Sequence, residues 1–198
     1  MYIKKIHIEN FKKFKGSFNL ELNDDLNIIV GNNEAGKSTV IEAIFLALTG
    51  MFRGKYLRNE LSQYLFNKDI VKDYISSVKA GNAQKPPKVL IEVYFGGEDA
   101  PALFNGSHNS ENSNDCGVRF EIEFNEKYND EYNSIIENSI ELKSLPIEYY
   151  DIVWTSFAWD NITSRSIPLK VALIDSESGK LPNGSDIYIS RIVKDSLE

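Results

Sequence analysis

One stretch of the sequence decides the fold, and it reads Gly31-Asn32-Asn33-Glu34-Ala35-Gly36-Lys37-Ser38-Thr39. It matches the pattern GxxxxGK[ST] of a phosphate-binding loop, in which successive backbone N–H groups curl around a β-phosphate. A Cβ at either glycine of the pattern would crowd that turn, so Gly31 and Gly36 supply the conformational freedom that it needs. We therefore expect this loop to bind a nucleotide.

The last three residues of the loop have separate expected roles. We expect Lys37 to reach the β- and γ-phosphates, Ser38 to coordinate Mg²⁺ and Thr39 to lie near the α-phosphate. The N-terminus of the helix that starts here favours anions, because its N–H groups and its macrodipole are positive. ATP and Mg²⁺ are therefore the expected cofactors.

The middle of the loop is less regular. Asn32 and Asn33 suit a tight turn because asparagine tolerates left-handed backbone conformations, and Ala35 is small. Glu34 is unexpected, since a carboxylate inside a phosphate cradle would be repelled by its ligand. We expect its side chain to point outward.

The flanking segments have the order that the motif requires. Residues 26–30 (Leu-Asn-Ile-Ile-Val) predict a buried strand, and residues 40–48 predict a mostly buried helix. This context disfavours a glycine-rich turn with a chance lysine. Strands predicted at 2–9 and 17–22, joined by a turn at 10–16, add an antiparallel platform. The expected fold class is therefore α/β, a P-loop NTPase with a mixed sheet that includes this antiparallel platform.

The rest of the chain predicts one domain over residues 1–198. Residues 96–117 are polar and rich in Asn, Ser and Gly, which indicates a mobile surface insertion. The alternation of apolar and polar residues or the helical spacing predicts strands at 88–95, 118–124, 147–157 and 167–174, and helices at 67–79, 130–142 and 185–197.

The composition is that of an ordinary globular protein, with 42% hydrophobic and 26% charged residues. No run of 18 apolar residues and no signal-peptide pattern is present, so we expect a cytoplasmic protein with no membrane partner. With Cys116 as the sole cysteine and only His7 and His108 as histidines, neither a disulfide nor a zinc site is expected.

Charge is unevenly spread along the chain, whose net charge is −7. The first fifteen residues carry five lysines and one glutamate, whereas residues 92–151 carry fourteen acidic and three basic side chains. That acidic stretch is either a solvated face or a docking face for a basic partner. Any contact with nucleic acid must come from a local basic patch or from a larger assembly.

The catalytic set looks incomplete. ATP hydrolysis needs a carboxylate that holds Mg²⁺ from a neighbouring strand. Asp175 is the candidate, because it follows the apolar residues 171–174, but Glu177 comes one place late for a Walker B pair; an ordinary aspartate at a strand end is the alternative. We therefore expect this chain alone to bind ATP without efficient hydrolysis.

Residues 6–14 and 28–44 resemble the N-terminal lobe of ABC-type ATPase heads in the RecF/SMC group, and within it the ATP-dependent endonucleases of the OLD family. Residues 60–67, 87–95 and 166–175 are similar to OLD-like chains in a less specific way. The resemblance implies a head completed by a second half-lobe and a TOPRIM nuclease domain, neither of which matches positions here.

The same resemblance implies roles for other residues. It places Lys12, Lys13 and Phe14 near the adenine and lowers the case for Asp175 as a Walker B residue. It also implies a Q-loop glutamine, but neither Gln63 nor Gln84 has the expected context.

Three functions remain open at this stage. The first is the ATP-binding lobe of an OLD-like endonuclease, in which head-to-head homodimerisation around ATP gates DNA cleavage in the intact protein. The second is a head lobe of a RecF/SMC-like DNA-repair ATPase without nuclease activity. The third is a self-contained P-loop NTPase or kinase with Asp175 as its metal ligand.

Overall fold

The computed structural model describes residues 1–82, 84–137 and 142–173. Within these ranges six strands form one sheet in the order β2-β1-β5-β7-β6, with β8 also paired to β7, and every pairing is antiparallel. The strands are β1 (Tyr2–Glu9), β2 (Ser17–Glu21), β5 (Val89–Gly96), β6 (Asn105–Gly106), β7 (Asp115–Phe124) and β8 (Tyr150–Ser156). A separate hairpin contains β3 (Met51–Phe52) and β4 (Lys55–Tyr56).

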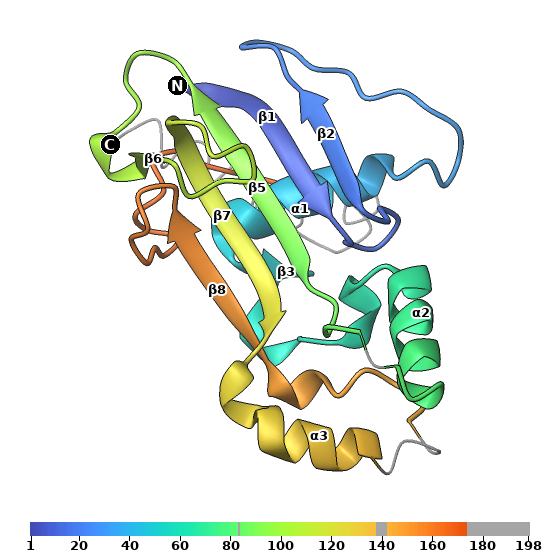
Figure 1. The fold of residues 1–198 in the computed structure, drawn as a ribbon. Coiled ribbons are helices and arrows are strands. Elements are labelled where there is room, and N and C mark those ends of the chain that lie inside the picture. The colour runs from blue at the N-terminus through green and yellow to red at the C-terminus, as the bar shows by residue number, and fades with distance from the viewer. Residues whose placement is uncertain (83, 138–141, 174–198) are drawn as a thin grey trace.

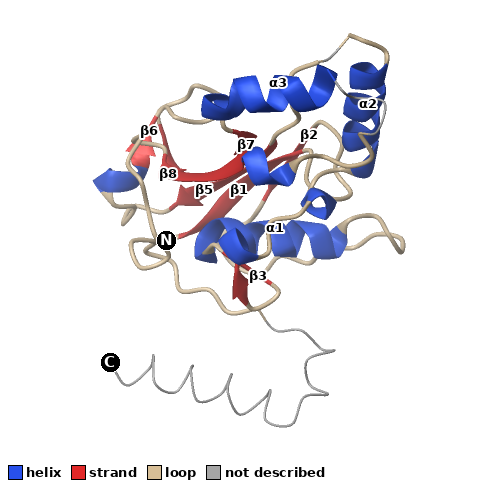
Figure 2. Cartoon of the chain, turned by 90° about the horizontal axis from the view of Figure 1, so that it is seen from below, coloured by secondary structure: helices blue, strands red, loops and turns tan. Residues whose placement is uncertain are grey.

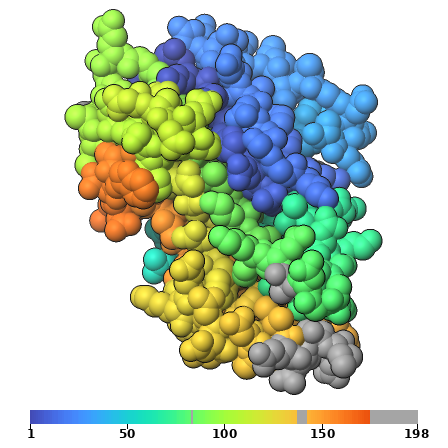
Figure 3. All heavy atoms as spheres, in the orientation of Figure 1, coloured from blue at the N-terminus to red at the C-terminus, as the bar shows by residue number. Residues whose placement is uncertain are grey.

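Among the described residues, α-helices lie on one face and at one end of this sheet (Figures 1 and 2). Helix α1 (Lys37–Thr49) lies across one face, whereas α2 (Lys68–Lys79) and α3 (Asn129–Glu137) lie at the end where β5 begins and β7 ends. The space-filling view shows the β1–β2 region beside α2 and the α3 region below β7 (Figure 3). Helix α1 packs mainly against β5 and β7, which are the central strands of the sheet.

The core lies between α1 and the sheet. Strand alternation directs one set of apolar side chains toward the helix, and α1 buries its own apolar face against them. The shared cluster includes Ile6, Ile8, Val40, Ala43, Leu46, Ala47, Ile91, Val93, Phe120 and Ile122. The indole Nε1 of Trp154 in β8 donates a hydrogen bond to the carbonyl oxygen of Ala47 at 2.9 Å, which ties the far strand to the helix.

The opposite face of the sheet carries a buried polar network. Glu92 is 0% exposed and accepts hydrogen bonds from the Tyr94 hydroxyl at 3.0 Å and the Ser110 backbone N–H at 2.9 Å. Arg119 pairs with Glu92 and makes two hydrogen bonds to Glu121, at 2.8 and 2.9 Å. Ser110 belongs to the segment expected to be a mobile insertion, so Glu92 anchors that segment to the sheet.

The segment at 96–117 has structure of its own. It contains a 3₁₀ turn at Ala102–Phe104 and strand β6, and both Phe104 and Asn109 are buried. Its polar composition reflects side chains that bind the loop backbone, since Asn109 donates to the Ser113 carbonyl at 2.7 Å. Its mobility stays a prediction, as does the assignment of one domain to residues 1–198.

The prediction of a buried strand at residues 26–30 is wrong. Leu26, Ile28 and Val30 are 74, 76 and 83% exposed, and no strand of the described residues pairs with this segment. Its apolar residues suit a strand with neighbours on both sides, but β1 takes β2 and β5 as its neighbours instead. The parallel strands of the expected mixed sheet are therefore not among the described pairings.

Smaller boundaries also differ. The helix expected at 130–142 is described only as Asn129–Glu137, and β8 begins at Tyr150 because a 3₁₀ turn occupies Ile147–Tyr149. Residues 167–173 form no strand. The helix expected at 185–197 lies outside the described residues.

A glycine at the end of α1 generates a stability prediction. Gly50 has a φ of +66°, and a Cβ built on it would lie 2.9 Å from the Trp154 ring. Gly54 has a similar φ of +80° but open space around it. We expect Gly50→Ala to lower the free energy of unfolding by about 1–3 kcal/mol more than Gly54→Ala, because only the first adds overpacking to backbone strain. Urea denaturation of both variants measures the difference, and equal losses would contradict the packing of Trp154 against the helix end.

The buried network generates a prediction on pH. Burial alone would raise the pKa of Glu121, but hydrogen bonds and charges from Arg119 and Lys88 outweigh it and lower that pKa. A lowered pKa contributes stability above the unfolded pKa of about 4.3, and this contribution is lost as the pH falls through the folded value.

We therefore expect wild-type protein to lose more unfolding free energy than Glu121→Gln on acidification below about pH 4.3. Denaturant titrations at neutral and acidic pH check this, with Glu98→Gln as the control because Glu98 is exposed. A parallel pH dependence in wild type and Glu121→Gln would show that the network does not favour the charged carboxylate.

Candidate nucleotide-binding site

The phosphate loop adopts a tight turn directly before α1. Glu34 and Gly36 have positive φ angles of 67° and 97°, and α1 begins at Lys37. A Cβ built on Gly36 would lie 3.0 Å from the Phe14 ring, so this position needs glycine both for its backbone angle and for space. The expected role of Gly36 thus has a local physical cause.

The Lys37 side chain folds back over the phosphate loop and hydrogen-bonds its backbone. Its Nζ donates to the carbonyl oxygens of Gly31 at 2.7 Å and Asn32 at 2.8 Å. The Ala35 N–H donates to the Asn32 carbonyl at 3.2 Å, which fixes the middle of the turn. The lysine therefore lies over the loop that it is expected to serve, with its charge beside the backbone that would surround a phosphate.

The N-terminus of α1 suits an anion. Gly36 is its N-cap and provides no side-chain hydrogen bond, and the first turn contains no acidic residue. The first N–H groups of a helix have no partner within the helix, so phosphate oxygens can accept hydrogen bonds from them. Ser38 is exposed and Thr39 is buried at this turn. These residues fit a nucleotide triphosphate, with the Ser38 hydroxyl as the group that would hold Mg²⁺.

Glu34 is directed away from the turn. Its side chain is 82% exposed, and its carboxylate lies 3.3 Å from Nζ of Lys13. An exposed pair of this kind is worth little energy in water. The Glu34 carboxylate therefore offsets part of the Lys13 charge beside the loop without fixing the lysine in place.

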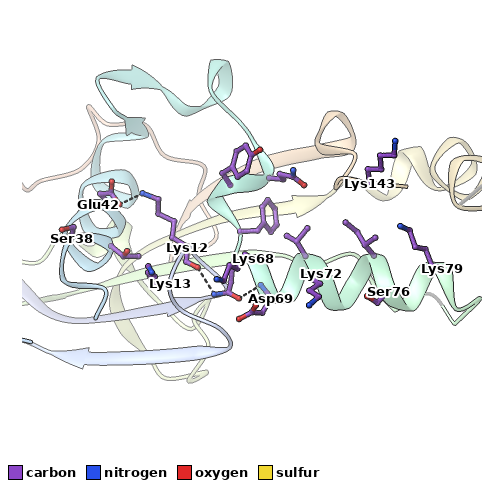
Figure 4. Close-up of a pocket in the computed structure, with 17 residues that line it drawn as sticks. Lys12, Lys13, Ser38, Glu42, Lys68, Asp69, Lys72, Ser76, Lys79 and Lys143 are labelled. Carbon is purple, nitrogen blue, oxygen red and sulfur yellow. Dashed lines mark hydrogen bonds and ion pairs between the residues drawn. The ribbon is translucent and has the colours of Figure 1, made fainter. Parts of the chain in front are cut away.

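Lys12 and Lys13, expected on the base side, lie in the β1–β2 turn beside α1 (Figure 4). Lys12 Nζ lies 2.5 Å from a carboxylate oxygen of Glu42, a residue of α1. The turn is held in place because the Lys12 N–H donates to the Leu65 carbonyl at 2.9 Å and the Asn67 side chain donates to the Lys12 carbonyl at 2.8 Å. Both lysines therefore come close to the loop, and both are paired with a carboxylate.

The Phe14 ring packs against the phosphate loop. It lies against Gly36 and stacks on Phe18 with a centroid distance of 4.1 Å and an interplanar angle of 22°. The resemblance placed Phe14 only near an adenine. Sequence reasoning also missed Glu42 and Asn67 as groups that position Lys12; the signal for Glu42 was a lone carboxylate within an otherwise apolar helical run.

The remaining candidates include Gln63 and Asp175. The Gln63 side chain accepts a hydrogen bond from the Leu145 N–H at 3.1 Å, which is a structural contact. Asp175 lies outside the described residues. Within residues 1–82, 84–137 and 142–173, no group of three or more His, Cys, Asp or Glu side chains could hold a metal ion.

Glu34 generates a prediction about affinity. Replacing its carboxylate by an amide in Glu34→Gln removes a negative charge beside the loop and releases Lys13. We expect MgATP to bind up to about fivefold more tightly, since an exposed charge contributes about 0.2–1 kcal/mol. Titration calorimetry at low and high salt measures the change, with the exposed Asp24→Asn as the control. A weaker affinity would show that the Glu34 carboxylate supports the bound state.

The chain is similar to several proteins over part of its length. It is 32% identical over 76 residues to DNA replication and repair protein RecF of Clostridium tetani, which covers 38% of this chain and 20% of that protein. RecF of Clostridium botulinum (strain ATCC 19397 / Type A) is 33% identical over 76 residues, covering 38% and 21%. Chromosome partition protein Smc of Synechococcus sp. is 29% identical over 99 residues, covering 50% and 7%. The chain thus matches about a fifth or less of the length of these relatives.

A solved structure from work on ATP-driven dimerization and DNA-stimulated activation of SMC ATPases also matches. It covers 100% of both chains with a TM-score of 0.43 and 14% sequence identity.

A family model described as an AAA domain, AAA_23, matches residues 5–170. This range contains the phosphate loop, the turn with Lys12 and Lys13, and helices α1 to α3. The match and the structure confirm the expected fold class, an α/β P-loop NTPase of the ABC-type head lobe kind, here with an antiparallel sheet. The chain belongs to the AAA_23 family of AAA domains.

Proposed function

We propose that this chain is the ATP-binding lobe of a RecF/SMC-type ATPase head. The observation that carries the proposal is the phosphate loop itself: an uncapped helix N-terminus, a left-handed Gly36 and Lys37 folded over the turn. Membership of the AAA_23 family and the partial similarity to RecF and Smc proteins support it.

Different residues of the site bind different parts of MgATP in this proposal. The loop N–H groups and the α1 N-terminus hold the phosphates, and Lys37 supplies a positive charge that can leave two backbone carbonyls for phosphate oxygens. Ser38 presents its hydroxyl to Mg²⁺, which supplies electrostatic stabilisation of the phosphates when bound. Lys12 and Lys13 lie beside the phosphate loop and contact the base side of the nucleotide.

The finer parts of the proposal concern the intact protein. We propose that two such heads form a homodimer around ATP, that hydrolysis is inefficient in this chain alone, and that the cytoplasmic protein acts on DNA in repair. Asp175 is retained as a proposed metal ligand only for a self-contained NTPase or kinase. Among the described residues, no helix has the length and apolar character needed to cross a membrane.

The OLD-like endonuclease is the second candidate. The resemblance of residues 6–14 and 28–44 favours it, but the relatives described above are RecF and Smc proteins. A TOPRIM-type acidic cluster in the gene beyond residue 198 would distinguish this candidate, whereas heptads of a coiled coil there would support an SMC-like head.

The nucleotide proposal is tested with Lys37→Ala. Charged hydrogen bonds contribute about 1.5–3 kcal/mol each, so we expect MgATP affinity to fall by about tenfold or more. Titration calorimetry measures it. Lys55→Ala is the control, because Lys55 is exposed and pairs with Glu60 away from the loop. Unchanged affinity in Lys37→Ala, with a wild-type thermal unfolding curve, would refute the proposal.

A further inference from the structure

A large groove runs from the phosphate loop along helix α2 (Figure 4). Its volume is about 1020 Å³, at the upper end of the range for small-ligand pockets. Ser38, Thr39 and Glu42 lie at one end, and Lys79 and Lys143 line it further along. The groove therefore extends beyond the phosphate loop along α2.

Lysines dominate the charge of this groove. Six line it, namely Lys12, Lys13, Lys68, Lys72, Lys79 and Lys143, against two acids, Glu42 and Asp69. Lys12 and Lys13 are paired, but the other four make no ion pair with any residue that the structure describes. A positive groove on a chain of net charge −7 is a local feature that its overall composition does not explain.

Helical spacing produces the row. Lys68, Lys72 and Lys79 lie four and seven residues apart, which places them along one side of α2. The acid Asp73 lies outside the groove and pairs with Lys15 instead. The eleven residue steps from Lys68 to Lys79 extend over about 17 Å at 1.5 Å per step. A strand stacked as in a duplex carries a phosphate about every 3.4 Å of helix axis, and an unpaired strand is more extended, so this length faces a few phosphates.

An aromatic side chain completes the groove. Tyr64 is 81% exposed and lines the same surface as the lysines. Apolar contacts come from Val71 and Ile75 of α2. An exposed aromatic ring beside lysines is the combination on which unpaired bases stack while their backbone follows the positive charge.

We propose that this groove binds single-stranded nucleic acid, with the backbone along the α2 lysines and a base stacked on Tyr64. The inference deepens the proposed function and rests on its DNA-directed role, and it concerns the part of the groove along α2, beyond Ser38 and Thr39 at the nucleotide end. A duplex has no unpaired base to offer Tyr64, and an acidic peptide has no base at all. Asn67, the N-cap of α2, donates a hydrogen bond to the Lys12 carbonyl and so ties the start of the helix to the β1–β2 turn.

The test measures fluorescence anisotropy of a labelled oligothymidylate with Lys72→Ala/Lys79→Ala. The matched control is Lys85→Ala/Lys127→Ala, which removes two exposed lysines outside the groove. We expect the first pair to lower affinity about tenfold or more and to reduce the slope of log K against log salt by about 0.7 per lysine. We expect the control pair to change the slope by much less. Equal effects of the two pairs would overturn the proposal.

Substitutions of Tyr64 and a comparison of ligands distinguish single-stranded nucleic acid from duplex DNA and from an acidic peptide. We expect Tyr64→Ala to weaken oligothymidylate binding by about tenfold, and Tyr64→Phe to restore it, since stacking needs the ring and not the hydroxyl. Oligouridylate in place of oligothymidylate tells RNA from DNA, and tighter binding of either supports the groove. Duplex DNA or polyglutamate that binds as tightly as the single strand would overturn the proposal.

Nucleotide binding is measured on the same proteins. We expect the Lys72→Ala/Lys79→Ala variant to keep the MgATP affinity of the wild type, and Lys37→Ala to keep its affinity for the oligonucleotide. If the wild-type protein binds the oligonucleotide but does not bind MgATP, the proposed function is refuted and the groove remains supported. The reverse result would refute the groove alone.

Discussion

The structure depends on how the chain enters helix α1. At Gly36 the backbone takes a φ of 97° and the Phe14 ring packs against the missing side chain, so helix and β1–β2 turn are brought together at one residue. From this point α1 buries its apolar face against the sheet, and Trp154 holds its other end. The candidate phosphate site is therefore a product of core packing as much as of its own loop sequence.

The two faces of the sheet are stabilised by different interactions. Toward α1 the contacts are apolar and their stabilisation follows the area removed from water. On the other face Glu92 and Arg119 are held by hydrogen bonds whose loss would leave a buried charge without compensation. This polar face binds the segment at 96–117 because the Ser110 N–H donates a hydrogen bond to the Glu92 carboxylate. Since the buried carboxylate must meet an N–H group, this contact fixes how the segment lies against the sheet.

Much of the fold and the loop was predictable because short-range rules govern them. The spacing of Gly31, Gly36 and Lys37 is a local signature, and the alternation in β1, β2 and β7 needs no distant partner to be recognised. The strand at 26–30 could not be decided in this way, since an apolar run forms a strand only when a neighbour offers its backbone. Helical spacing predicts the lysine row of α2, but the pairing of Lys12 with Glu42 and the meeting of that row with Lys12, Lys13 and Lys143 in one groove join residues distant in sequence, for which no spacing rule exists.

The exposed stretch with Leu26, Ile28 and Val30 has a practical meaning for the molecule in solution. Three branched apolar side chains at every second position, without a strand beside them in the described part of the chain, form a template on which another extended chain can add. Self-association through this stretch would rise with protein concentration and would be favoured by warming, because apolar association strengthens on heating.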